Sequence, residues 1–130
     1  MEKEFVTYEQ ALALKELGFD EMCFAYYNCE RDLIIVRGKM KFLTCEFAVP
    51  LKQQVFRWFR EKYFLDCEIY VQEERGHKFY HYLVLQLVRG NIEWKSKNTT
   101  RFKIYEEAES ACIYKLMDIV KQHNNGIQKI

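Results

Sequence analysis

The segment at residues 50–64 constrains the fold of this 130-residue chain more than any other stretch, because it predicts an amphipathic helix rich in aromatic residues. At about 100° per residue, its apolar side chains gather on one broad arc. That arc comprises Leu51, Val55, Phe56, Trp58, Phe59 and Tyr63. The opposite side carries Gln53, Gln54, Arg57, Arg60 and Glu61. We therefore expect one face in a core and another face that presents two arginines one turn apart.

Two further helices are predicted on either side of this segment. Thr7 and Gln10 have the spacing of a capping box at a helix start. Gly18 is suited to end that first helix in a left-handed conformation, with Phe19 as the hydrophobic contact that follows. The last helix is expected over 105–122, with the stretch 124–126 as its stop.

Six stretches between these helices predict strands. Alternating or β-branched sequence and intervening turn residues indicate strands, and the first group is expected to form an antiparallel meander. The predicted strands are 23–27, 33–36, 42–49, 67–73, 79–88 and, more weakly, 92–95. The predicted turns are 28–32, 37–41 and 75–78.

Together these elements predict a single α+β domain covering residues 1–130. Its antiparallel sheet has about five or six strands packed against three helices, in the order α-βββ-α-ββ(β)-α. With 16% aromatic residues, a disordered chain is excluded. Tyr and Trp on an exposed face often mark an interface, so we expect a homodimer or higher oligomer.

The charge and cysteine content limit the protein's setting. The formal net charge is +1, so no global field draws the protein to nucleic acid or membrane. The charged N-terminus does not fit a signal peptide, and no apolar run has the length of a membrane span. The five cysteines are odd in number and scattered, which favours a reducing compartment over a disulfide framework. We therefore expect a cytoplasmic protein without a membrane partner.

The residues that could form a catalytic, metal or cofactor site are better explained by structural roles. His77 and His81 straddle a turn and a strand rather than sharing a helical face, so no metal site is predicted. The glycines are single, which argues against a phosphate-binding loop and leaves no cofactor implied. A catalytic Cys45 or Cys67 beside His81 remains an open alternative, although small buried hydrophobes are the favoured interpretation. The protein is predicted not to be an enzyme.

Basic residues interleaved with aromatics between positions 57 and 103 are the remaining signal. Arginine forks recognise phosphate, and aromatic faces stack on bases. The predicted ligand-binding residues are Arg57, Arg60, Arg75, Lys78, Tyr82 and Trp94. The competing interpretation is that the aromatics pack the sheet and the charges form a solvated face.

Three stretches carry a resemblance to a known family. The sequences at 8–19, 50–63 and 105–109 resemble small, uncharacterised proteins of tailed phages and prophages, mainly from Bacteroidetes hosts. The run Trp-Phe-Arg-Glu-Lys-Tyr at 58–63 is the most specific part. The resemblance implies no catalytic residues. It implies only a phage-encoded protein that acts in the bacterial cytoplasm or in the virion.

In that setting, the inventory of arginines, lysines and aromatics favours a non-enzymatic protein that interferes with antiphage defence. The most direct route is to sequester a nucleotide immune signal in the cytoplasm of the infected host. One alternative is an accessory protein that binds single-stranded nucleic acid. Another is a protein-partner or inhibitor module that docks through the aromatic helix at 51–64.

Overall fold

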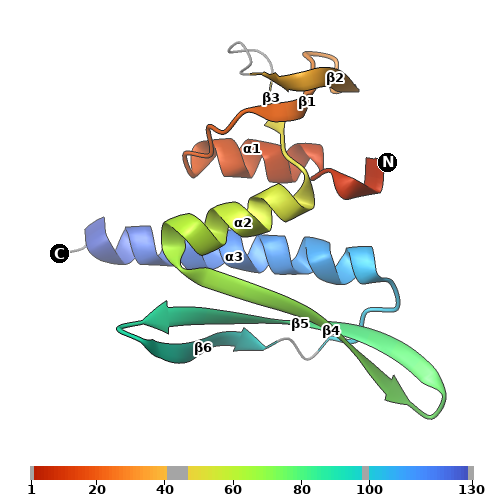
Figure 1. The fold of residues 1–130 in the computed structure, drawn as a ribbon, viewed down its shortest axis with the longest axis vertical. Helices are drawn as coiled ribbons and strands as arrows, with labels where there is room; N and C mark the ends of the chain where they lie inside the picture. The colour runs from red at the N-terminus through yellow and green to blue at the C-terminus, as the bar shows by residue number, and fades with distance from the viewer. Residues whose placement is uncertain (1, 41–46, 98–99, 129–130) are drawn as a thin grey trace. The chain divides into compact units, whose positions relative to one another are not determined.

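The computed structural model describes residues 2–40, 47–97 and 100–128, without the side chains of 2, 37–40, 47, 94, 95, 97 and 125–128. Within that part, three α helices and six strands confirm the predicted α+β class and element order (Figure 1). The helices are η1 (Glu2–Glu4), α1 (Tyr8–Glu16), α2 (Lys52–Tyr63) and α3 (Tyr105–Gln128). The strands are β1 (Cys23–Tyr27), β2 (Leu33–Met40), β3 (Phe47–Val49), β4 (Leu65–Glu74), β5 (His77–Val88) and β6 (Asn91–Lys97).

The strands form two separate sheets, and this corrects the prediction of one sheet. The orders are β2-β1-β3 and β4-β5-β6, all pairs being antiparallel. The chain divides into two compact units, Met1–Val55 and Phe56–Ile130, so each unit holds one sheet. The twelve residues of α2 intervene between the two groups of strands, whereas short connections join the second group. The prediction of one domain over 1–130 stays a prediction.

In the first unit, β1 is the central strand, so the predicted meander is wrong. Cys23 and Ala25 are fully buried, which suits a strand that is paired on both edges. The turn predicted at 37–41 is also wrong for residues 37–40, because these residues belong to β2, which ends at Met40. Of the strand predicted at 42–49, the described part is β3, and 42–46 lie outside the described residues.

The ends of α1 confirm the predicted signals. The Thr7 N–H donates to Gln10 Oε1 over 3.0 Å, and the Gln10 N–H donates to Thr7 Oγ1 over 3.2 Å. At the other end, Gly18 has φ 96°, and the Phe19 N–H donates to the Leu14 carbonyl over 2.9 Å. These bonds satisfy backbone groups that a helix leaves unpaired at its ends.

The second unit is a hairpin sheet with α3 across one face (Figure 1). Two-residue turns join its strands, with φ of 53° and 81° at Arg75 and Gly76 and of 50° and 81° at Arg89 and Gly90. Positive φ at both positions is the type I′ pattern, which matches the twist of paired strands. Of the turn predicted at 75–78, only Arg75 and Gly76 form the turn, and His77 and Lys78 belong to β5.

The helix α3 supplies a large part of the core of this unit. Its fully buried residues include Ala108, Cys112, Ile113, Leu116 and Val120, and Val84 of β5 is also fully buried. The helix runs to Gln128, so the predicted stop at 124–126 is wrong. Asn and Gly weaken a helix locally, but a helix that is already about five turns long absorbs that cost.

The aromatic arc of α2 is buried as predicted. Phe56, Trp58 and Phe59 are each at most 5% exposed. The predicted polar side contains one exception, because Gln54 is buried and its Nε2 donates to Glu21 Oε1 and the Met22 carbonyl, both over 3.1 Å. A buried amide is tolerated when its hydrogen bonds are made.

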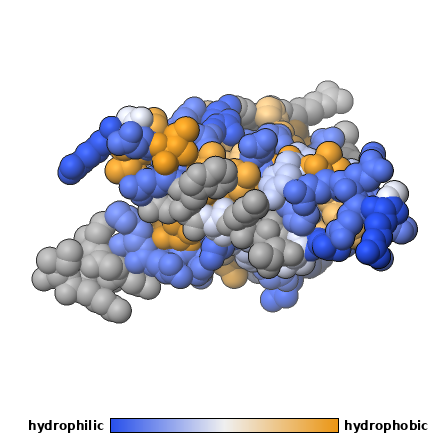
Figure 2. Space-filling view, turned by 90° about the horizontal axis from the view of Figure 1, so that it is seen from below, coloured by the Kyte–Doolittle hydropathy of each residue, from blue (hydrophilic) through white to orange (hydrophobic). Residues whose placement is uncertain are grey.

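No helix in the described ranges has the length and apolar character needed to cross a membrane. The face seen in Figure 2 carries small apolar patches among hydrophilic residues.

Candidate ligand-binding cavity

The structure separates the predicted basic residues into two pairs. Arg57 and Arg60 are exposed on α2, whereas Arg75 lies in the β4–β5 turn and Lys78 lies at the start of β5. The ten residues of β4 join these two places. At about 3.3 Å per residue, that strand holds the pairs roughly 30 Å apart. The four cations therefore do not form one small-ligand site.

The two predicted aromatics do not complete the site either. Tyr82 is only 9% exposed, so its ring offers little surface for stacking. Burial and the neighbouring Cys112 raise the pKa of its phenol, and a hydrogen bond with Ser96 partly offsets that rise. Trp94 pairs through its backbone with Leu85, but its side chain lies outside the described part.

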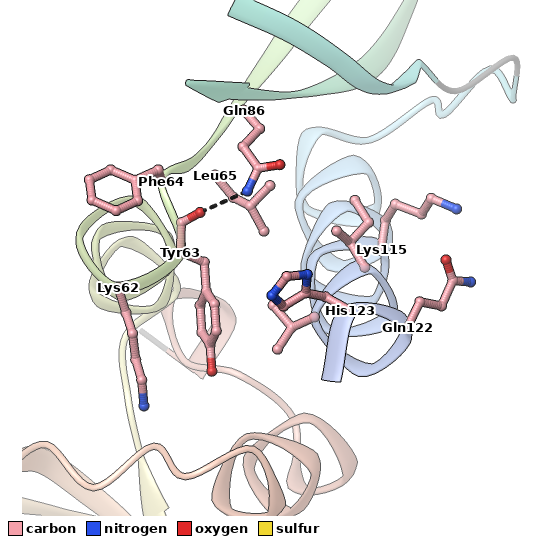
Figure 3. Close-up of a pocket in the computed structure, with 10 residues that line it drawn as sticks. Lys62, Tyr63, Phe64, Leu65, Gln86, Lys115, Gln122 and His123 are labelled. Atoms are coloured by element: carbon pink, nitrogen blue, oxygen red, sulfur yellow. Dashed lines mark hydrogen bonds between the residues drawn. The ribbon is translucent and has the colours of Figure 1, made fainter. Parts of the chain in front are cut away.

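The second unit contains a cavity of about 570 Å³ that none of these residues lines. It lies where α2 ends, at the start of β4 and against the C-terminal half of α3 (Figure 3). We call it the helix-end cavity. Leu65 and Val120 are its buried lining residues, and Tyr63, Gln86 and the α3 side chains complete the wall.

Backbone geometry at the end of α2 forms one side of this cavity. Phe64 has φ 57° and is 60% exposed. The Gln86 Nε2 donates to the Tyr63 carbonyl over 3.1 Å, and the Leu87 N–H donates to the Phe64 carbonyl over 3.2 Å. A left-handed conformation favours glycine and strains a phenylalanine, and such strain concentrates at functional sites. These hydrogen bonds hold the Phe64 backbone beside the cavity, and in Figure 3 its exposed ring extends away from the space between the helices.

Three potential cations line the cavity from two helices. Lys62 comes from α2, and Lys115 and His123 come from α3. In Figure 3 the His123 ring lies between the two helices, whereas the Lys62 side chain extends down from α2 and the Lys115 side chain extends to the outer side of α3. The Lys62 Nζ lies 5.1 Å from the Trp58 ring centroid, and the Lys115 Nζ lies 3.8 Å from Asp118 Oδ2. Exposed contacts of this kind are weak, so both lysines can turn to a ligand at little cost.

The lining favours an anion that also has an apolar part. No Asp or Glu is among the described lining residues, whereas two lysines are. The nearby helix ends present carbonyls rather than N–H groups, which favour the cations already present. An anion must therefore be held by the lysine and histidine side chains, with the Tyr63 and Phe64 rings as apolar contacts.

The sequence did not reveal this cavity because its residues form no local motif. Lys62 and Phe64 meet Lys115 and His123 only after α3 packs beside the end of α2. The one local signal is a large apolar residue, Phe64, directly after the last helical turn, where glycine is the usual choice.

The open alternative of a catalytic cysteine beside His81 is not supported at Cys67. Cys67 pairs with Val84 on the α3 side of the sheet, whereas His81 alternates to the other side. Cys45 lies outside the described residues. Among the described residues, no group of three or more His, Cys, Asp or Glu is placed to hold a metal ion.

Comparisons with protein families, with characterised proteins and with solved structures gave no match to this chain.

Proposed function

We propose that the protein is a non-enzymatic, phage-encoded binding protein that interferes with host antiphage defence by sequestering a nucleotide signal. The phage setting rests on the family resemblance of the sequence. The binding role rests on one observation, the helix-end cavity with its lysines, histidine and aromatic rings and no described carboxylate. The proposed place of action is the cytoplasm of the infected host.

The dimensions and chemistry of the cavity support a nucleotide-type ligand. A volume of about 570 Å³ lies within the range of roughly 300–1,000 Å³ that is usual for small-molecule sites. Lys62 and Lys115 stand on opposite walls and supply charge for phosphate oxygens. The exposed Phe64 ring can turn from the position seen in Figure 3 to stack on a base.

The lining also supports binding without turnover. None of the described lining residues is Ser, Thr, Cys, Asp or Glu. Aliphatic hydroxyl, thiol and carboxylate nucleophiles are therefore missing from the described lining, which leaves lysine, histidine and tyrosine as the nucleophile types present. We expect Lys62, Lys115 and His123 to bind through charge and hydrogen bonds, so that the ligand leaves the site unchanged.

The test starts with native mass spectrometry of protein purified from phage-infected cells that carry a defence system. A retained phosphate-containing adduct, released by heat with an unchanged mass, supports sequestration. Calorimetry with the released compound then compares wild type with the double variant Lys62→Gln, Lys115→Gln. Two lost charge-assisted contacts predict at least about a 100-fold loss of affinity.

The matched control removes the same charge from the hairpin turn, as Arg75→Gln with Lys78→Gln. The control is expected to bind like wild type. If only the control loses affinity, or if Arg57→Gln with Arg60→Gln does so, the helix-end cavity is the wrong site. A clean protein without adduct moves the search to a macromolecular partner.

Binding of single-stranded nucleic acid is less well supported. A nucleic acid strand that contacts both pairs, Arg57 with Arg60 and Arg75 with Lys78, would run along β4. Its exposed side chains include Asp66, Glu68, Glu73 and Glu74, which repel phosphate. A steep loss of affinity with salt and a preference for longer strands would nevertheless favour this role.

Docking through the aromatic helix is also less well supported. Phe56, Trp58 and Phe59 are buried, so they are not displayed to a partner. The homodimer or higher oligomer stays a prediction, and light scattering after size exclusion measures it.

A further inference from the structure

A second cavity of about 300 Å³ lies near the far end of the β4–β5 hairpin. We call it the hairpin cavity. Its lining residues are Gln72, Glu73, Glu74, Phe79, His81 and Arg101. Tyr80, between two of them, contacts Tyr105 of α3 with ring centroids 5.7 Å apart. Because side chains alternate along a strand, Phe79 and His81 lie on the face turned away from α3.

His81 brings an unsatisfied hydrogen-bonding atom to this cavity. The residue is only 7% exposed, and its Nδ1 is buried without a hydrogen-bond partner in the described protein. Its ring stacks on Tyr70, with centroids 5.4 Å apart and an interplanar angle of 24°. A buried polar atom left unpaired is energetically costly, so such atoms usually serve a ligand or a water.

The contacts of Arg101 show that the walls of the cavity can bind a guanidinium group. Its Nη2 lies 2.7 Å from Glu74 Oε2, and its guanidinium carbon lies 5.4 Å from the Phe79 ring centroid. Two backbone hydrogen bonds between Tyr80 and Phe102, of 2.7 and 3.1 Å, hold the neighbouring residue to β5. A carboxylate and a ring face already recognise one guanidinium here.

The remaining groups favour a second cation. Arg101 holds Glu74 only through an exposed ion pair, which is weak and can exchange with another cation. Glu73 alternates to the other face, opposite Lys78, so the acceptors on this face are the Glu74 carboxylate, His81 Nδ1 and the Gln72 side-chain carbonyl. These acceptors fit a ligand that is rich in N–H donors.

We propose that the hairpin cavity binds a guanidinium or ammonium group, whose N–H donors bond to His81 Nδ1, to the Gln72 side-chain carbonyl and to the carboxylate of Glu74, in exchange for Arg101. The group belongs either to an arginine or lysine side chain of a partner polypeptide or to a free small molecule. The site is separate from the helix-end cavity and does not depend on its function.

The test is an NMR titration with Nα-acetylarginine amide, with the neutral Nα-acetylcitrulline amide as the matched probe. The arginine probe should shift the amide signals of residues 72–74, 79–81 and 101 and the imidazole ¹⁵N signals of His81. The citrulline probe should not. Equal shifts with both probes, or shifts that map elsewhere, overturn the proposal, as does no shift at all, the result expected if His81 serves only a water.

Variants separate a binding role of His81 from a structural one. Replacing His81 by Phe removes a buried unpaired nitrogen while keeping a planar ring, so the melting temperature should stay or rise. Affinity for the arginine probe should fall about tenfold, the effect of one lost hydrogen bond to a charged group. His77→Phe, on the exposed end of the same strand, should leave affinity unchanged. If His81→Phe binds like wild type, the proposal is wrong.

Two further variants keep the test decisive if His81→Phe does not fold. Glu74→Gln should weaken binding of the arginine probe, and Arg101→Gln should strengthen it severalfold by releasing Glu74. If Glu74→Gln binds the probe more tightly than wild type and Arg101→Gln binds it more weakly, the proposal is wrong. An arginine-containing extended peptide that binds at least tenfold tighter than the free amide identifies a polypeptide source, whereas equal affinity identifies a small molecule.

Discussion

The helix-end cavity and the hairpin cavity belong to the same sheet but carry opposite charges. The first has Lys62 and Lys115 with no carboxylate among its described lining residues. The second has Glu73 and Glu74 against a single arginine. α3 lines the first and not the second. The comparison shows that a net charge of +1 conceals two local preferences, because each cavity selects ligands through its own few side chains.

The largest expected effect comes from the core beneath α3. Leu116 is fully buried, and Leu116→Ala should lower the free energy of unfolding by about 3 kcal/mol. Urea denaturation measures the loss, with Tyr114→Ala, at a half-exposed position of the same helix, as the control. Hydrogen exchange should rise in α3 and around the helix-end cavity more than in residues 72–81. Uniform loosening would show that the two cavities are not independent.

Charge reversal at one wall should separate the two cavities. Lys62→Glu should weaken a nucleotide ligand about 100-fold, because it replaces an attraction by a repulsion, and should leave the arginine probe unaffected. Glu74→Lys should have the reverse pattern. Calorimetry of both ligands with both variants measures this. A variant that changes both affinities alike would contradict separate sites.

Alkaline pH should lower the free energy of unfolding through a thiol on the α3 side of the sheet. A hydrogen bond with Cys67, burial, and the charges of Cys67 and Glu109 raise the pKa of the Cys112 thiol. The unfolded chain therefore loses this proton first, at about pH 8.5, and the folded state loses stability as pH rises further. At about 1.4 kcal/mol per pH unit, we expect a loss of roughly 2 kcal/mol between pH 8.5 and 10.

Denaturation across that pH range provides the measurement. Cys112→Ala should flatten the decline below pH 10, and Cys29→Ala, at an exposed position, should not. Above about pH 10, the raised pKa of Tyr82 adds to the same trend, with the same sign. A decline that persists in Cys112→Ala below pH 10 would assign the effect to other groups.

The smallest expected effect concerns the strained residue at the end of α2. Phe64→Gly removes the left-handed strain but adds freedom to the unfolded chain, so stability should change by less than about 1 kcal/mol. Nucleotide affinity should still fall about tenfold, because a stacking surface is lost. Thermal melting and calorimetry measure the two quantities. Unchanged affinity would remove Phe64 from the site.

Local signals in the sequence predicted local structure well. The caps of α1, the aromatic arc of α2 and the turn at Arg75 and Gly76 all depend on residues within a few positions of each other. The predicted helix end at 124–126 was wrong because it relied on local preference alone. Packing of α3 on the sheet outweighs the local preference of Asn and Gly.

The candidate sites depend on distant residues, and the sequence could not predict them. Which of several tyrosines is exposed depends on which face meets α3, and Tyr82 faces inward. The order β2-β1-β3 likewise follows from pairing between segments rather than from alternation within them. Lys62 and His123 come together only through tertiary packing, so no spacing rule identifies them.

The boundary between the two units falls inside a helix, which has a consequence for dissecting the protein. The Val55 N–H donates to the Leu51 carbonyl over 3.1 Å, so the helical ladder is already established where the first unit ends. A cut between 55 and 56 would break several of these bonds at once and leave each fragment with less than the length at which a helix is stable alone. Any excised half that is meant to fold must therefore carry the whole of α2, and cooperativity between the halves can pass along its backbone.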